Sequence, residues 1–547
     1  MRKSMFLVLA AVVVLAATPA LAELQNVIVG GQVRIRGNYY MNTPTNINRS
    51  NLQWRDGLLS GRSNINRSSL QWPAGLLSGR SIGTGLNYNA PGVVGLIGWD
   101  DKENSLGYVE HRTRLNVKAD FSNEVGAFIE IDSYDIWGED FRSDYVTGAD
   151  FRAATARAGT ADDVEIYQSY IEANEMFGLP LRLRVGRQEL SFGSEWLVGV
   201  NDTSSGFTGL SFDAVRLTYA TDMFSVDAFM AELAEGFAFE EDEDVWLYGV
   251  YGSYLGLEDI VIDAYWLWLR DAQRLRGDTD LTWFGEWWED IFGIDDYDPT
   301  NLHTVGLRGA GTIGAFDFEA EFAYQFGDAD SVGFLFRPYI YGDDGADFSA
   351  WAANLEVGYT FDMAWQPRVW VGGAYFDGED NRDISWWEWI SPFSDPEASV
   401  SFNRLFSNWE YSQFLDRTDL SNVWLVRGGV QAMPTESIEL ALVVTYFQAL
   451  EEFDAPAHIT LGGWRIPIAP FFSFWTMEND SDLGIETGLT ATYHYSEDLV
   501  FEAGWAHLFV DDGATDGQYV LRNGLGFTGG TSDDDADYLY LETRIQF

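Results

Sequence analysis

The chain has 547 residues, of which 16% are aromatic, with 55 Gly, 14 Pro and no Cys. Its formal net charge of −52 excludes general binding to nucleic acid, because a phosphate backbone needs a basic protein face. Aromatic residues at this level suit the interfacial girdles of a membrane barrel, and frequent Gly suits its bends and turns.

The first residues, 1–22, are typical of a secretory signal peptide. A basic start precedes an apolar run from Met5 to Ala17, and Ala20-Leu21-Ala22 forms a small-x-small cleavage site. The apolar run is too short to span a bilayer as a helix, which needs about 20 residues. We therefore expect a mature chain that begins at Glu23 and forms a single domain over 23–547.

Alternating apolar and polar residues begin in the segment 27–40 and continue in the hairpin 109–134. Soluble sandwiches hide an apolar face in a core. Many such segments with charges at every second position suit instead a barrel in lipid around a wet lumen. No later apolar run has the length of a membrane helix, so a closed barrel is the spanning fold that remains.

A long polar stretch between these segments contains a tandem repeat, NINRSNLQWRDGLLSGRS at 46–63 and NINRSSLQWPAGLLSGRS at 64–81. Two copies are too few for a solenoid, which needs at least about three repeats to bury a core. Because exposed loops tolerate insertions, we interpret 46–81 as a duplicated loop insert.

Beyond the hairpin, similar alternating segments recur to the end of the chain. They are predicted at 163–175, 180–190, 211–220, 223–234, 244–254, 258–270, 300–313, 315–327, 350–361, 366–377, 421–433, 436–449, 483–495, 498–510 and 536–547. Short and long connections alternate between them. The sequence thus predicts an all-β fold, a transmembrane antiparallel barrel of about 18 strands with short periplasmic turns and long extracellular loops. Such barrels usually end on a Phe that signals assembly, so Phe547 is expected to engage the barrel-assembly machinery.

The polar face of this pattern places many arginines and carboxylates in the lumen. Arginine holds carboxylate or phosphate through its planar fork and stays charged at any relevant pH. The candidate pore-lining residues are Arg34, Arg36, Arg112, Arg114, Arg182, Arg184, Arg216, Arg308, Glu130, Asp132, Glu319 and Glu321. Two interpretations stay open. Basic residues on one wall and acidic residues on another could create a transverse electric field for polar solutes, or the charges could pair with each other and fill the barrel.

Catalytic and cofactor motifs are missing from the sequence. The five His residues form no metal-ligand spacing, and no GxSxG occurs, so we predict neither an enzyme nor a cofactor. Acidic runs such as 240–244 and 533–535 are expected to be solvated or to hold divalent cations that bridge to lipopolysaccharide phosphates. The expected surroundings are outer-membrane lipid and lipopolysaccharide.

Several segments resemble the alginate-export family of outer-membrane porins. The resemblance rests on HRTRLNVKADF at 111–121, VEIYQSYIEAN at 164–174, LRLRVGRQELSFGSEWLVG from 181, FDAVRLTY at 212–219 and the closing DDDADYLYLETRIQF. It implies an 18-stranded barrel whose arginine-rich constriction passes an anionic polysaccharide. The residues matched by motif are Arg112, Arg114, Arg184, Arg187 and Arg216, with Gln188, Trp196 and Asp213 as neighbours.

Strand alternation turns Arg187 toward lipid unless a bulge lies near Gly186 or the strand has already ended.

The functional prediction is a channel in the bacterial outer membrane for passive diffusion of polar, and possibly anionic, saccharide or carboxylate solutes. Two alternatives remain. One is a general or cation-preferring porin, which the net charge favours. The other is a plugged structural or adhesive protein, for which the long first connection could fold inward.

Overall fold

A computed structural model describes most of the strand-forming chain. The described residues are 24–42, 96–98, 105–122, 124–137, 164–202, 209–234, 244–272, 299–328, 346–378, 398–415, 420–450, 455–456, 458–461, 464–467, 476–477, 480–515, 518–522, 525–528 and 535–547. The predicted signal peptide and the tandem repeat at 46–81 lie outside these residues, as does the acidic run 240–243.

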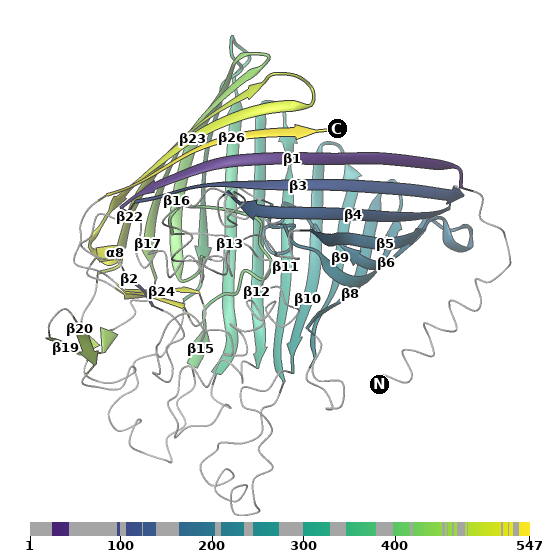
Figure 1. Ribbon diagram of the computed structural model, residues 1–547. Coiled ribbons are helices and arrows are strands. Elements are labelled where there is room, and N and C mark those ends of the chain that lie inside the picture. The colour runs from purple at the N-terminus through teal and green to yellow at the C-terminus, as the bar shows by residue number, and fades with distance from the viewer. Residues whose placement is uncertain are drawn as a thin grey trace, which may run out of the picture.

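Within the described part of the chain, eighteen antiparallel strands close into a barrel (Figure 1). Each strand pairs with the next along the chain, and β1 closes the ring by pairing with both β3 and β26. The strands are β1 (Asn26–Met41), β3 (Ser105–Ser122), β4 (Val125–Ile136), β5 (Glu165–Ala173), β6 (Leu181–Gln188), β7 (Phe212–Ala220), β8 (Phe224–Ala234), β9 (Val245–Leu257), β10 (Ile260–Asp271), β11 (Thr300–Ile313), β12 (Phe316–Asp328), β13 (Ala346–Thr360), β14 (Arg368–Phe376), β16 (Val423–Thr435), β17 (Ile438–Ala449), β22 (Asp482–His494), β23 (Leu499–Val510) and β26 (Ala536–Gln546). The predicted fold class and strand number are confirmed.

Short elements occupy some of the connections. They are β2 (Leu96–Gly98), η2 (Met176–Gly178), β15 (Ala398–Val400), β18 (Ala455–Pro456), β19 (His458–Leu461), β20 (Trp464–Pro467), β21 (Thr476–Met477), α8 (Asp512–Thr515), β24 (Gln518–Arg522) and β25 (Leu525–Thr528). Strand β15 adds to the main sheet in parallel with β13. The sequence pattern did not predict these pieces. None of the helices in the described residues has the length and hydrophobicity to cross a membrane.

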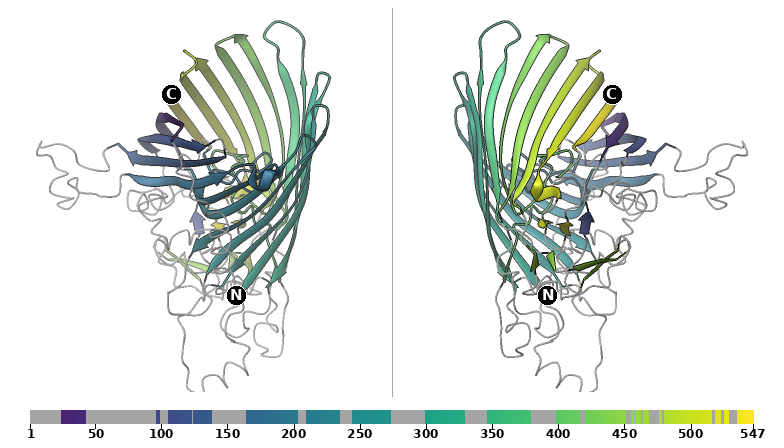
Figure 2. Two further views of the ribbon diagram at one scale, coloured as in Figure 1. Left: turned by 90° about the vertical axis from the view of Figure 1, so that its right-hand side faces the viewer. Right: turned by 90° about the vertical axis from the view of Figure 1, so that its left-hand side faces the viewer.

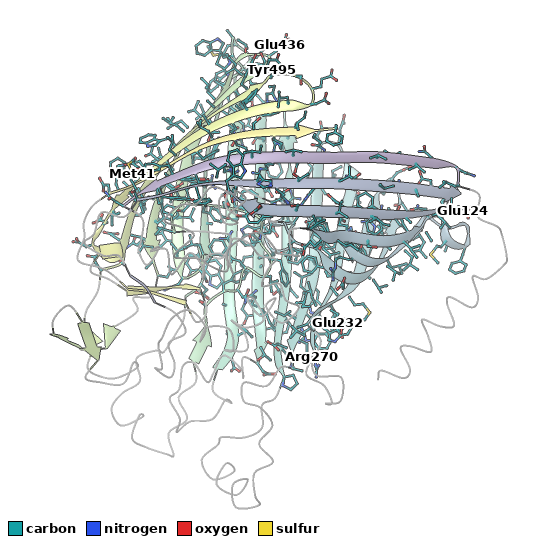
Figure 3. All side chains as sticks on the ribbon, in the orientation of Figure 1. Met41, Glu124, Glu232, Arg270, Glu436 and Tyr495 are labelled. Atoms are coloured by element: carbon teal, nitrogen blue, oxygen red, sulfur yellow. The ribbon has the colours of Figure 1, made fainter. Side chains whose placement is uncertain are left out.

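Short turns gather at one end of the barrel and the long connections leave from the other. Glu436 and Tyr495 mark two of the short turns, whereas Glu232 and Arg270 lie near the opposite end (Figure 3). The strands are steeply inclined to each other around the ring, and β1, β3 and β4 run across the direction of β10 to β13 (Figures 1 and 2). The short-turn end is the one that the sequence predicts to be periplasmic.

The two faces of each strand differ in polarity, as β12 illustrates. Phe322 and Tyr324 point outward and are exposed, whereas Glu321, Ala323 and Gln325 between them are buried. The outer face therefore presents apolar side chains to lipid, and polar side chains point into the barrel.

Two connections fold into the barrel and form an apolar core there. We call residues 189–202 the first inner segment and residues 401–415 the second inner segment. Trp196 and Leu197 of the first are almost fully buried, as is Phe402 of the second, and all belong to one hydrophobic cluster with lumen-facing wall residues. The segments pair with each other, because Phe406 N–H donates to Leu197 O at 2.8 Å and Gly199 N–H donates to Phe406 O at 2.9 Å. An inward fold of this kind was left open by the sequence.

The first strand, β1, meets the C-terminal residue at Gly31 and Phe547, whose backbones exchange hydrogen bonds of 2.9 and 3.0 Å. A Cβ on Gly31 would lie 2.7 Å from Cζ of Phe547 and 2.7 Å from Arg114 O. We therefore expect Gly31→Val to reduce the yield of folded barrel strongly, measured as the heat-modifiable band on a gel. Gly309→Val is the matched control, because a Cβ there meets no atom within 4 Å. Equal yields for the two variants would contradict the prediction.

Candidate functional site

Arginines from three neighbouring strands form a row across the lumen wall. In the strand register Arg34 of β1 lies directly opposite Arg112 of β3 on one side and Arg544 of β26 on the other. Like charges in directly opposed positions destabilise a sheet. Such a row therefore needs counter-charges from elsewhere.

Carboxylates of the adjoining strands supply part of this charge. Glu542 accepts from Arg34 Nε at 2.8 Å and from Arg36 Nη2 at 2.5 Å. Asp132 accepts from Arg112 Nε at 2.8 Å and from Arg114 Nε at 3.2 Å. Arg112 and Asp132 have no exposed side-chain surface, so this ion pair is fully withdrawn from solvent.

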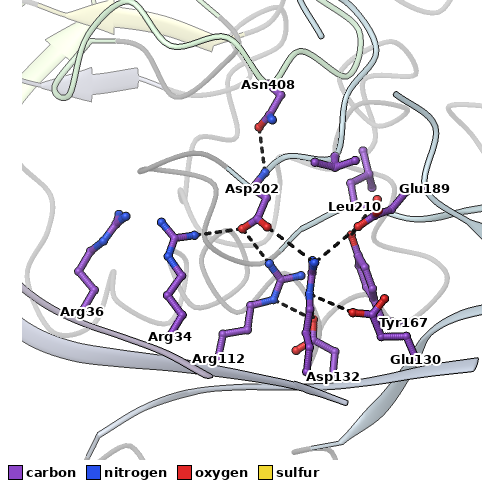
Figure 4. Close-up of polar contacts among 12 residues, drawn as sticks. Arg34, Arg36, Arg112, Glu130, Asp132, Tyr167, Glu189, Asp202, Leu210 and Asn408 are labelled. Atoms are coloured by element: carbon purple, nitrogen blue, oxygen red, sulfur yellow. Dashed lines mark hydrogen bonds and ion pairs between the residues drawn. The ribbon is translucent and has the colours of Figure 1, made fainter. Parts of the chain in front are cut away.

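Asp202 of the first inner segment supplies a further negative charge and lies at the centre of the cluster (Figure 4). Its Oδ1 accepts from Arg34 Nη1 at 3.0 Å and from Arg112 Nη1 at 2.9 Å, and Oδ2 lies 3.7 Å from Arg114 Nη1. Its backbone N–H donates to Asn408 Oδ1 of the second inner segment at 2.8 Å. Both inner segments are thereby held against the arginine row.

Tyr167 and Glu189 extend the cluster on the β5 side. The Tyr167 hydroxyl donates to Glu189 at 2.7 Å, and the Arg114 guanidinium lies 4.2 Å from the centre of the Tyr167 ring. Glu130 lies 3.7 Å from Arg114 and accepts from Gln168 at 2.8 Å. Burial raises the pKa of both Glu189 and Asp202, because removal of water disfavours the ionised carboxylate.

The opposite wall carries more acid than base. Arg308 of β11 binds Asp263 at 2.8 Å and Glu319 at 2.9 Å, and its Nε lies 3.9 Å from Glu321. The Tyr265 hydroxyl donates to Glu321 at 2.8 Å. One guanidinium thus lies close to three carboxylates, so acidic groups outnumber basic groups in this part of the wall.

Three further predicted arginines line the lumen between the two walls. Arg184 binds Glu172 at 2.7 Å and Arg216 binds Asp227 at 2.8 Å. Arg182 donates to the hydroxyl of Thr218 at 3.4 Å. Most of the predicted lumen charges are therefore paired across adjoining strands, the arrangement that the second interpretation of the sequence described.

Arg187 corrects the motif-based list, because the structure places it on the outer face. It forms a bidentate pair with Asp213, both contacts being 2.8 Å, and Asp213 is more than half exposed. Gly186 has a φ of +128°, yet the β5–β6 and β6–β7 registers run through it without a shift. With no bulge to invert the alternation, Gln188 points inward and Arg187 points outward.

Several site residues could not be found by sequence reasoning. Asp202 and Asn408 lie in connections without periodicity, and their partners lie far away along the chain.

Trp196, a neighbour in the family motif, is 1% exposed and donates through Nε1 to the Tyr411 hydroxyl at 2.9 Å. That hydroxyl donates to Asn354 Oδ1 of β13 at 2.9 Å, which ties both inner segments to the wall. In the described residues no group of three metal-binding side chains occurs.

An apolar outer surface, a charged interior and closed antiparallel strands define the class of outer-membrane β-barrel channels. The sequence profile described as "Alginate export" matches residues 100–520. The chain therefore belongs to the alginate-export family and is an outer-membrane channel protein.

Solved structures with a similar chain path include three bacterial proteins. OccK8 (OprE) of Pseudomonas aeruginosa is 10% identical with a TM-score of 0.47, over 95% of this chain and 98% of that one. OccAB4 of Acinetobacter baumannii is 10% identical with a TM-score of 0.45, over 96% and 100%. The anion-selective porin of Comamonas acidovorans is 9% identical with a TM-score of 0.37, over 95% and 99%. A comparison with curated proteins gave no match.

Proposed function

We propose that this barrel passes small polar solutes by passive diffusion, with a preference for anions that carry a carboxylate. The observation that carries the proposal is the convergence of Arg34, Arg112 and Arg114 on the carboxylate of Asp202. The guanidinium groups that hold this carboxylate of the protein have the donor geometry that the carboxylate of a solute requires. The candidate lumen residues are the twelve pore-lining residues named in the sequence analysis. Arg187, which the family motif added to them, is left out because it points outward.

A specific observation also supports the second candidate, a closed or structural barrel. The apolar cluster of the inner segments reaches lumen-facing residues of several strands, among them Phe229 of β8 and Phe376 of β14. Close packing of this kind excludes water. In this candidate the inner segments close the lumen, and the long connections bind lipopolysaccharide or divalent ions.

The test is the reversal potential of the refolded protein in a planar bilayer under a salt gradient. The proposal expects anion preference despite a net charge of −52, because the charges of exposed loops are screened within about 8 Å at physiological salt. Cation preference would assign control to the acidic wall and make the protein a general or cation-preferring porin. No conductance would favour the closed barrel.

Three partner assignments stay proposals. Phe547 is proposed to engage the barrel-assembly machinery, and the outer surface to contact lipid and lipopolysaccharide. Loop carboxylates are proposed to bind divalent cations, and we propose that the channel itself needs no cofactor and performs no catalysis.

A further inference from the structure

Four polar side chains of β26, β1 and β3 form a patch on the lumen wall toward the short-turn end. The patch consists of Arg544 and Gln546 of β26, Gln32 of β1 and Asn116 of β3. In the register Gln32 lies opposite Gln546, and Arg544 lies opposite Arg34 in the next lumen-facing row. Asn116 lies opposite Gly30, in the row on the other side of Gln32.

These side chains differ from the arginine cluster beside them, because they have no partners. In the described part of the chain, no hydrogen bond or ion pair joins any of the four side chains to another group, whereas Arg34 in the same row binds two carboxylates. Gln546 is exposed, and Gln32, Asn116 and Arg544 are half-buried. The patch therefore presents its polar groups to the water of the lumen.

The charge of Arg544 is left uncompensated by direct contacts. Glu542, two residues earlier on the same face, is bound by Arg34 and Arg36. Glu502 of β23 accepts from the Tyr540 hydroxyl at 2.6 Å and does not contact Arg544. The guanidinium fork is free to bind an anion in two parallel hydrogen bonds.

The size and chemistry of the patch indicate a ligand class. Neighbouring strands lie about 4.8 Å apart and successive residues on one face about 7 Å apart, so the patch spans roughly 10 Å by 14 Å. The three amides offer both donors and acceptors, which suits hydroxyl groups, and Arg544 suits a carboxylate. We propose that this patch is a binding site for small hydroxylated carboxylates at the short-turn mouth of the lumen, distinct from the buried arginine cluster. It deepens the proposed function, on which its biological role rests.

Isothermal titration of the full chain in detergent with sodium gluconate tests the site. Arg544→Gln is expected to weaken gluconate binding at least about tenfold, because it removes charge-assisted hydrogen bonds. Gln32→Ala is expected to weaken gluconate binding while leaving the weaker binding of propionate, which has no hydroxyl groups, unchanged. Sorbitol, which has no carboxylate, is expected not to bind measurably.

Arg187→Gln is the matched control, since it removes an arginine from the outer face. Heat modifiability verifies that each variant is folded. Equal gluconate affinity in Arg544→Gln and Arg187→Gln would overturn the proposal, as would binding of sorbitol as tight as that of gluconate. The titration does not depend on conduction. If conductance is anion-selective but Arg544→Gln leaves gluconate affinity unchanged, this site is refuted and the proposed function stands. If Arg544→Gln weakens gluconate binding but the channel shows no anion preference, the proposed function is refuted and the site stands.

Discussion

Trp196→Ala is expected to increase single-channel conductance more than any other single substitution in the inner segments. The indole is 1% exposed, packs between Phe376 and Phe402 with ring centroids 5.7 and 6.3 Å away, and donates to Tyr411. Truncating a buried Trp to Ala typically costs about 3–5 kcal/mol. Here the lost free energy destabilises the packing of the two inner segments in the lumen, whereas the strands keep their backbone hydrogen bonds. The segments should loosen inside an intact barrel.

Single-channel recording in planar bilayers measures the result. Trp365→Ala is the matched control, because Trp365 lies in the short connection between β13 and β14 and is 60% exposed. Unchanged conductance in Trp196→Ala, together with retained heat modifiability, would mean that the inner segments do not limit the open lumen.

Local pattern was enough to predict the barrel, but not its contents. Strand alternation is a property of neighbouring residues, so every one of the predicted segments overlaps a strand of the ring. The parity of Arg187 was also correct, and the motif resemblance that placed it in the lumen was wrong. The physical reason is that a two-residue period is imposed by the pleat wherever the register continues unbroken.

The inner segments lay beyond such reasoning. Residues 189–202 have no repeating pattern, and the partners of Asp202 lie on β1, β3 and the second inner segment. Contacts of this kind depend on the whole ring being closed. Sequence spacing cannot predict them, which is why the sequence left open whether the arginines line a free lumen surface or pair with carboxylates, as most of them do.

This pairing also determines how the arginine cluster can be tested. Removing Arg112 would leave Asp132 buried without its closest counter-charge, and loss of one partner of a buried ion pair typically costs about 3–5 kcal/mol. A change in selectivity would then be confounded with misfolding. Asp202 is the better target, because it belongs to an inner segment and not to the strands of the barrel.

Asp202→Asn is expected to raise anion preference while leaving the inner segments in place. Burial raises the pKa of Asp202 in the inserted position above that of a solvated carboxyl, because withdrawal from water makes its negative charge costly there, although Arg114 and Arg34 lower the pKa. By the same linkage, proton uptake stabilises the inserted state, and that contribution is lost as pH rises through the folded pKa. An uncharged isostere should therefore remain inserted, with its backbone N–H still bonded to Asn408.

Selectivity should change because one negative charge leaves the centre of three guanidinium groups. At an effective dielectric constant near 20, a unit charge about 4 Å away contributes about 4 kcal/mol, so even a small unscreened fraction alters the ratio of anion to cation permeability several-fold. The reversal potential in a salt gradient measures this ratio. Glu319→Gln on the opposite wall is the matched control, because it removes a carboxylate bound to Arg308 and leaves the cluster untouched. A larger shift in Glu319→Gln than in Asp202→Asn would mean that the acidic wall, and not the arginine row, determines which ions pass.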